Sequence, residues 1–151
     1  MKRHDSLLLV AREHHESLVI ARRLVTGRAS AGSDWPDSPA AQAQALAQFH
    51  ERHLRRHFAA EEQAVFPAAR ECGAEAVALA ERLAAEHRQM TGRIRELAAD
   101  AAVDAAALAA FGELLNAHVR LEDRQFFPML ETGLAPARLL RLQAELEALY
   151  R

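Results

Sequence analysis

The sequence lacks the residues that several common kinds of site require. It contains one cysteine, Cys72, so it cannot form an internal disulfide or build an all-thiolate zinc or iron–sulfur site within one chain. Aromatic residues make up only 5% of the 151 residues, and alanine and leucine supply most of the apolar side chains. No glycine-rich phosphate loop and no serine nucleophile motif is found. This composition is typical of a helical protein with one domain over residues 1–151.

The sequence also lacks a strong charge of one sign and a long apolar run. Its 19 Lys and Arg nearly balance its 21 Asp and Glu, and no basic stretch indicates a nucleic-acid partner. The apolar run at residues 7–11 is interrupted by Arg12 and Glu13, too early for a signal peptide or a membrane span. We therefore expect a cytoplasmic protein with no nucleic-acid or membrane partner.

Apolar residues recur at helical spacing, and no segment alternates long enough to predict a strand. The fold class is therefore all-α, with helices expected at about residues 6–25, 39–72, 74–100, 104–131 and 136–150. A loop rich in Gly and Pro is expected at residues 26–39, with Trp35 as a hydrophobic plug over one end of the molecule. Pro67 lies inside a helical pattern and should kink the helix or loosen a turn. The last helix carries a leucine stripe that packs on the other helices or serves a homodimer interface.

One motif occurs twice and organises the chain. His57 is followed by Glu61 and His118 by Glu122, and each copy continues with a second acid and then Phe-Pro. Positions four residues apart lie on the same face of a helix. Each copy therefore presents an imidazole nitrogen and a carboxylate together, which are ligands that Fe, Mn and Zn accept.

A Glu-His pair precedes each copy, with the histidines at His14 and His87. Helical phase and the repeat favour His14 over the adjacent His15, although the apolar residues nearby also allow His15 to face inward. Four inward histidines and two inward carboxylates would be destabilising in a core, because each unpaired buried carboxylate costs several kcal/mol. A cation removes that cost, and two shared carboxylates indicate two ions.

The second acids of the two motifs, Glu62 and Asp123, lie about 100° around the helix from the motif glutamates. We interpret Asp123 as part of a solvated face with arginine partners. For Glu62 that interpretation and the orientation of a ligand histidine remain open alternatives. His50 and His53 have no counterpart in the second half and are expected to be solvated or hydrogen-bonded surface histidines.

Together these motifs resemble the hemerythrin-like, or HHE cation-binding, family over residues 7–130. The resemblance implies an antiparallel up-down four-helix bundle with a short C-terminal helix. It also implies a non-haem di-iron centre, oxo- or hydroxo-bridged, that takes a small ligand such as O2, NO or peroxide. The metal ligands it implies are His14, His57, Glu61, His87, His118 and Glu122, with Glu61 and Glu122 bridging.

The sequence departs from the oxygen-carrying hemerythrins at Thr91, where those proteins have a second histidine four residues after the first. The departure at Thr91 therefore argues against reversible oxygen carriage. The ligand set resembles that of the iron–sulfur-repair di-iron proteins, which usually carry an extra cysteine-containing domain that this sequence does not show. The alternatives are an iron-handling protein that donates iron, and a helical protein with a hydrolytic or structural Zn or Mn site. The same residues would serve a binding module or an enzyme.

Overall fold

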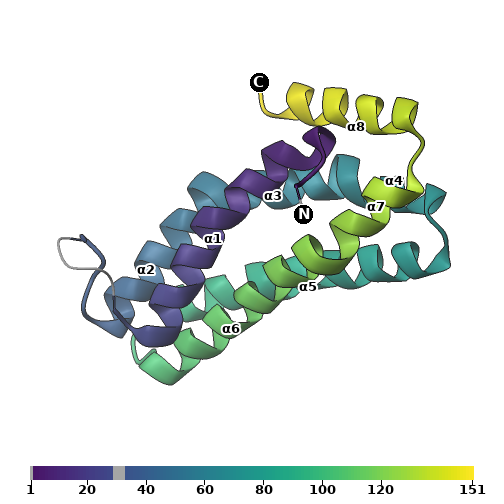
Figure 1. Cartoon of the computed structure of the whole chain (residues 1–151). Helices are drawn as coiled ribbons and strands as arrows, with labels where there is room; N and C mark the ends of the chain where they lie inside the picture. The colour runs from purple at the N-terminus through teal and green to yellow at the C-terminus, as the bar shows by residue number, and fades with distance from the viewer. Residues whose placement is uncertain (1, 29–32) are drawn as a thin grey trace.

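A computed structural model describes residues 2–28 and 33–151 of the chain. Within these ranges every regular element is a helix, as Figure 1 shows, so the all-α prediction is confirmed. Part of the loop expected at residues 26–39, namely 29–32, lies outside the described residues. None of the described helices is both long and apolar enough to cross a membrane.

The first helix, α1 (Leu8–Thr26), follows a 3-10 turn at Asp5–Leu7. It ends at Gly27, whose φ of 69° places it in the left-handed region. Glycine adopts that conformation without the steric cost that a Cβ would bring, and its N–H donates to the carbonyl of Arg23. The predicted helix at residues 6–25 therefore ends where the first glycine of the loop permits it.

The helix expected at residues 39–72 is one helical rod made of several segments. They are α2 (Pro39–Phe49), a π turn at His50–Leu54, α3 (Arg55–Ala60), a π turn at Glu61–Val65, α4 (Phe66–Ala68) and a 3-10 turn at Ala69–Glu71. The Ser38 side chain caps the start by accepting a hydrogen bond from the N–H of Ala41. Proline at the first helical position costs nothing, because that N–H has no partner within a helix.

The remaining chain forms α5 (Ala74–Ala99), α6 (Ala105–Leu121), a π turn at Glu122–Phe126, α7 (Phe127–Gly133) and α8 (Pro136–Leu149). The loosened turn predicted at Pro67 is confirmed as the π turn before it, and Pro128 has the same kind of turn before it. A proline has no N–H to donate to the preceding turn, so the hydrogen-bond pattern widens there. Each of these two π turns begins at a motif glutamate.

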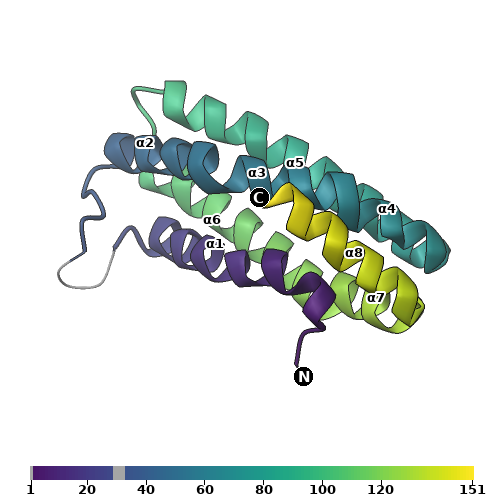
Figure 2. The same ribbon diagram turned by 90° about the horizontal axis from the view of Figure 1, so that it is seen from above.

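The long helices lie side by side, with α1 against α6 and α2 against α5 (Figure 2). Gly112 permits the contact between α1 and α6, because a Cβ there would lie 2.6 Å from the carbonyl oxygen of Ala21. Helix α8 lies along one half of the bundle, over the 3-10 turn at Asp5–Leu7 and the π turn at Glu61–Val65. Its residues Leu139, Leu142 and Leu146 are buried there, so the leucine stripe packs within the chain.

Two apolar clusters form the core and leave a polar layer between them. One cluster contains Phe127 and the three buried leucines of α8, and the other contains Phe58, Phe111 and the apolar face of α2. Trp35 packs against the second cluster, as the plug prediction required. The polar layer touches both clusters, since Phe127 stacks on His14 and Phe58 stacks on His87. The core thus positions the residues of the candidate site.

Candidate metal centre

Four helical rods each contribute one histidine to a single buried cluster. His14 lies on α1, His57 on α3, His87 on α5 and His118 on α6, while Glu61 and Glu122 begin the two π turns. All six predicted site residues are between 0 and 3% exposed. The structure therefore brings the whole predicted set together. It also buries His14 and leaves the adjacent His15 exposed.

Each glutamate lies between histidines from both halves of the chain. Glu61 Oε1 is 3.4 Å from His57 Nε2 and 3.1 Å from His87 Nε2. Glu122 Oε1 is 3.0 Å from His14 Nε2 and 3.6 Å from His118 Nε2. The two carboxylates are thus shared, and neither belongs to one half alone.

The six residues form two overlapping groups that could each hold an ion. One group is His14, His57, Glu61 and Glu122, and the other is Glu61, His87, His118 and Glu122. Within each group one ligand atom from every residue lies within 4.8 Å of the others. Two groups that share two carboxylates are the arrangement expected of a pair of bridged ions in a helical bundle.

Three carboxylates outside the cluster set the orientation of three histidines. Asp123 Oδ1 is 2.9 Å from His14 Nδ1, Glu13 Oε1 is 3.0 Å from His57 Nδ1, and Glu86 Oε1 is 2.8 Å from His118 Nδ1. A carboxylate can only accept, so each of these Nδ1 atoms carries the proton and donates. The Nε2 lone pair of each ring is then directed into the cluster, where a metal would take it.

The interpretation of Asp123 as a solvated residue with arginine partners is wrong. Its side chain reaches His14 because adjacent residues of a helix point about 100° apart and α6 packs directly against α1. Glu62, its counterpart, lies 3.6 Å from His87 Nδ1, which is too long for a hydrogen bond. Glu62 therefore lies beside His87 without a hydrogen bond that would orient the His87 ring.

Sequence reasoning missed the roles of Glu13 and Glu86. The repeated Glu-His pair was the signal in the sequence, but only its histidine was interpreted as a site residue. Each glutamate serves the histidine of the following helix rather than its own neighbour: Glu13 faces His57 and Glu86 faces His118. Adjacent residues of a helix point about 100° apart, so the glutamate reaches the next rod while the histidine faces the cluster.

The residues present fit metal ions. Both carboxylate oxygens of Glu61, both of Glu122 and His14 Nε2 are buried without a hydrogen-bond partner in the described residues. The close approach of His14 Nε2 to Glu122 Oε1 lacks hydrogen-bond geometry despite its 3.0 Å. His87 Nε2 and His118 Nε2 are 3.1 Å apart. Buried acceptors that face one another need a cation, and a donor set of N and O suits Fe, Mn or Zn.

Burial and mutual contact shift the pKa values of the cluster strongly. Burial alone would lower the pKa of His57, but Glu61 and Glu13 raise it to about 9. Burial also opposes protonation of His14, yet Asp123 and Glu122 hold its pKa well above the ordinary range.

Burial, with the Glu61 charge added, raises the pKa of Glu122 to about 7. Despite its burial, the pKa of Glu61 is held well below its ordinary value, chiefly by His57. Protons therefore compete with metal for this site near neutral pH.

Two histidines upstream of the first motif, His50 and His53, lie outside the two groups. The prediction that His50 is a surface residue is wrong, because it is only 8% exposed. Its side chain lies at a surface recess that Arg55 and Arg95 also line, and not in the buried cluster. His53 is partly exposed, with Nε2 3.3 Å from Glu16. Neither residue belongs to the groups that could hold an ion.

Comparison with known proteins identifies one family. The family model described as the hemerythrin HHE cation binding domain matches residues 7–130, which is most of the chain. The matched stretch contains all six residues of the cluster and the three carboxylates that orient its histidines. No curated protein and no solved structure gives a significant match.

Proposed function

The chain belongs to the hemerythrin HHE cation-binding domain family, and from this premise we propose that it is a non-haem di-iron protein. Its metal pair binds or reacts with a small ligand, such as O2, NO or peroxide. The six ligands are His14, His57, Glu61, His87, His118 and Glu122, with Glu61 and Glu122 shared between the ions. The same membership supports an antiparallel up-down arrangement of α1, the rod α2–α4, α5 and the rod α6–α7.

One observation carries this proposal. Two fully buried glutamates lie between two pairs of histidines, and all four carboxylate oxygens lack a hydrogen-bond partner among the described residues. A single ion would leave one pair of histidines without a metal ion to coordinate. Two divalent ions of the Fe, Mn or Zn class satisfy the carboxylates and both pairs of imidazoles together.

The protein groups have separate tasks at this site. Glu13, Glu86 and Asp123 hold three histidine rings with Nε2 toward the cluster. Phe58 and Phe127 stack on His87 and His14 and exclude water from those faces. Iron, when bound, supplies one-electron redox chemistry and open coordination positions. Thr91 stands where the oxygen-carrying hemerythrins have a further histidine, so this chain offers fewer ligands than they do.

Iron handling is the second candidate function, and one observation favours it. His87 Nδ1 is buried without a partner, and this residue borders a recess on the molecular surface. A ligand histidine that is weakly oriented and close to solvent favours release of its ion. In that case the protein would hold iron and supply it to another protein.

Matched histidine variants test the metal assignment. His118→Ala removes a buried proposed ligand, whereas His15→Ala removes an exposed neighbour of His14 as a control. Metal analysis of protein purified from iron-supplemented cells should give iron in the control at the wild-type level and a large loss in His118→Ala. Equal iron content in the two folded variants would contradict the assignment of His118 as a metal ligand. Zinc in place of iron would contradict the proposal that the ions are iron.

A further inference from the structure

The two groups that could each hold an ion differ in how their histidines are supported. We name them position A (His14 and His57 with the two glutamates) and position B (His87 and His118 with the same glutamates). In position A both rings donate from Nδ1 to a carboxylate, at 2.9 and 3.0 Å. In position B only His118 does so, at 2.8 Å to Glu86. His87 Nδ1 is buried without a partner among the described residues.

Further contacts fix the outer carboxylate of position A. Arg56 contacts Glu13 at 3.3 Å, and the hydroxyl of Tyr150 also donates to Glu13. Arg56 in turn lies over the Tyr150 ring, 4.7 Å from its centroid. Tyr150 directly follows α8, so the C-terminal helix covers this side of the cluster. The orientation of His57 is therefore held by a chain of contacts that ends in another element.

The corresponding carboxylate near His87 has no such support. Glu62 approaches His87 Nδ1 only to 3.6 Å, and its side chain is 42% exposed. It therefore neither fixes the ring nor raises its basicity through a hydrogen bond. An outer partner of a metal-bound histidine is worth about 10- to 100-fold in metal affinity. Position B has one such partner, whereas position A has two.

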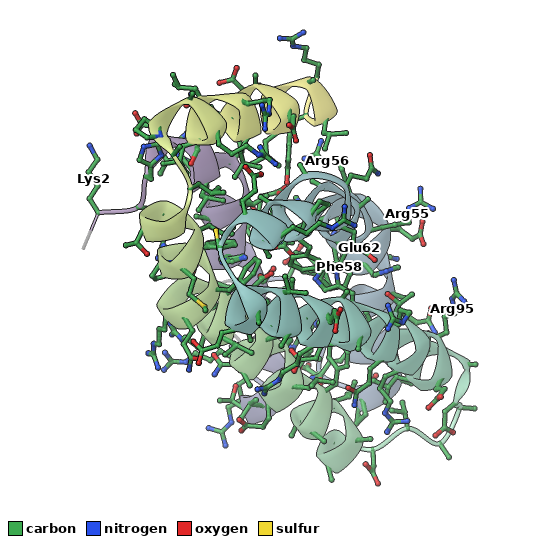
Figure 3. All side chains as sticks on the ribbon, turned by 90° about the vertical axis from the view of Figure 1, so that its right-hand side faces the viewer. Lys2, Arg55, Arg56, Phe58, Glu62 and Arg95 are labelled. Carbon is green, nitrogen blue, oxygen red and sulfur yellow. The ribbon has the colours of Figure 1, made fainter. Side chains whose placement is uncertain are left out.

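A surface recess lies against position B. It has a volume of about 510 Å³, and its lining includes Phe58, Glu62, His87, Thr91 and Arg95. Figure 3 views this side of the molecule, with Phe58 close to Glu62 and with Arg55 and Arg95 at the outer edge. The Phe58 ring stacks on His87 at 3.9 Å, so one aromatic side chain and the histidine itself separate the recess from the cluster. Solvent thus reaches the wall of position B.

We propose that the two positions are unequal, so that position A retains its ion and position B is the exchangeable one, reached through this recess. The proposal rests on the proposed function in one respect, namely that each group holds one ion. It adds which ion exchanges and from which side. A small ligand or a chelator then acts first at the ion held by His87 and His118.

Titration of the metal-free protein with Co²⁺ tests the order of affinities, followed by calorimetry and by visible absorption. We expect two binding steps, the second at least about tenfold weaker than the first. Repulsion between two ions could also separate the steps, so two variants assign them. His87→Ala should keep the strong step and lose the weak one. His57→Ala should lose the strong step and bind its remaining ion weakly.

The outcomes separate this inference from the proposed function. Each folded variant should retain one binding step. If the retained steps of His87→Ala and His57→Ala have equal affinity, the inference is overturned while a two-ion site stays in place. Failure of the wild-type chain to bind Co²⁺ would overturn both. Circular dichroism of each variant establishes that it is folded.

A gain-of-ligand variant provides a test that does not depend on removing a core residue. The motifs on α3 and α6 place two ligands four residues apart, and Thr91 follows His87 on α5 at the same spacing. Thr91 lines the recess, which has room for a larger side chain. Thr91→His should strengthen the weak step about tenfold and leave the strong step unchanged. Strengthening of the strong step instead would contradict the assignment of position B.

Discussion

At the scale of single residues, the carboxylates outside the ligand set decide which nitrogen each histidine turns inward. Glu13, Glu86 and Asp123 accept from Nδ1 of three different histidines, so each Nε2 is available to an ion. All three acids come from a different rod than the histidine they orient. The metal site is therefore completed only when the rods are packed, although the two repeated motifs and the two Glu-His pairs contain all six proposed ligands.

The first prediction concerns Glu86. Glu86→Gln keeps the shape of the side chain but removes the charge that holds the His118 imidazole, so affinity for Zn²⁺ should fall about tenfold. Competition with a chromophoric chelator measures the affinity. Glu16→Gln, at a mostly exposed glutamate beside His53, is the matched control and should bind as the wild type does. Equal affinities in both variants would refute the orienting role of Glu86.

The second prediction concerns pH and the metal-free protein. The pKa of His57 is raised from 6.5 to about 9, so its stabilisation is complete below about pH 6.5 and is lost as pH rises through about 9. The pKa of Glu122 is raised from 4.5 to about 7, so its stabilisation is likewise lost with rising pH. The Tm of the metal-free protein should therefore fall between pH 6.5 and 9, with a loss on the order of 3 kcal/mol from His57.

The metal-loaded protein should behave in the opposite way. Metal ions take the Nε2 lone pairs that protons occupy in the metal-free protein, so binding releases protons and strengthens as pH rises. Thermal scans of both forms over the same buffers make the comparison. A metal-free Tm that is constant or rises from pH 6.5 to 9 would contradict the assigned pKa shifts.

At the scale of secondary-structure elements, the helices follow from local sequence signals, whereas the details of the two motif rods do not. Helical periodicity and the glycines predicted the boundaries of α1, α5 and α8 to within a few residues. Proline predicted a loosened turn but not a π turn that starts at the ligand glutamate. The helical wheel places Asp123 about 100° from Glu122, but only the packing of α6 against α1 shows that this face meets His14.

The third prediction tests the link between α8 and position A. Tyr150→Phe keeps the ring under Arg56 but removes the hydroxyl that donates to Glu13. The His57 ring is then held less firmly, and we expect the strong binding step to weaken several-fold while the weak step stays the same. Leu140→Ala, at an exposed position of α8, is the control. An unchanged strong step in Tyr150→Phe would show that α8 does not influence the site.

The fourth prediction concerns the packing of α8. Leu142 is fully buried, whereas Leu140 on the same helix is 66% exposed. Leu142→Ala should reduce the free energy of unfolding by about 2–5 kcal/mol, because it removes buried methyl groups and leaves a cavity. Leu140→Ala should change it by less than about 0.5 kcal/mol. Denaturant unfolding measures both, and similar losses would mean that α8 is not docked through its leucine stripe.

At the scale of the whole molecule, the buried cluster connects all four rods and both halves of the chain. The inward set of four histidines and two glutamates could be predicted because each lies on an apolar helix face and repeats at a fixed spacing. His50 could not be distinguished from a surface histidine, because it has no counterpart in the second half of the chain and its burial depends on the elements packed around it. The inequality of positions A and B depends on contacts between distant elements, such as Glu13 with Tyr150, which no local pattern contains.

The central claim is that this cluster holds a pair of redox-active iron ions. Metal analysis of the aerobically purified protein, combined with an optical spectrum before and after dithionite, tests it most directly. The account predicts two irons per chain and near-ultraviolet absorption bands that bleach on reduction. Zinc in the site, or a folded chain that carries no metal and has no such bands, would contradict it.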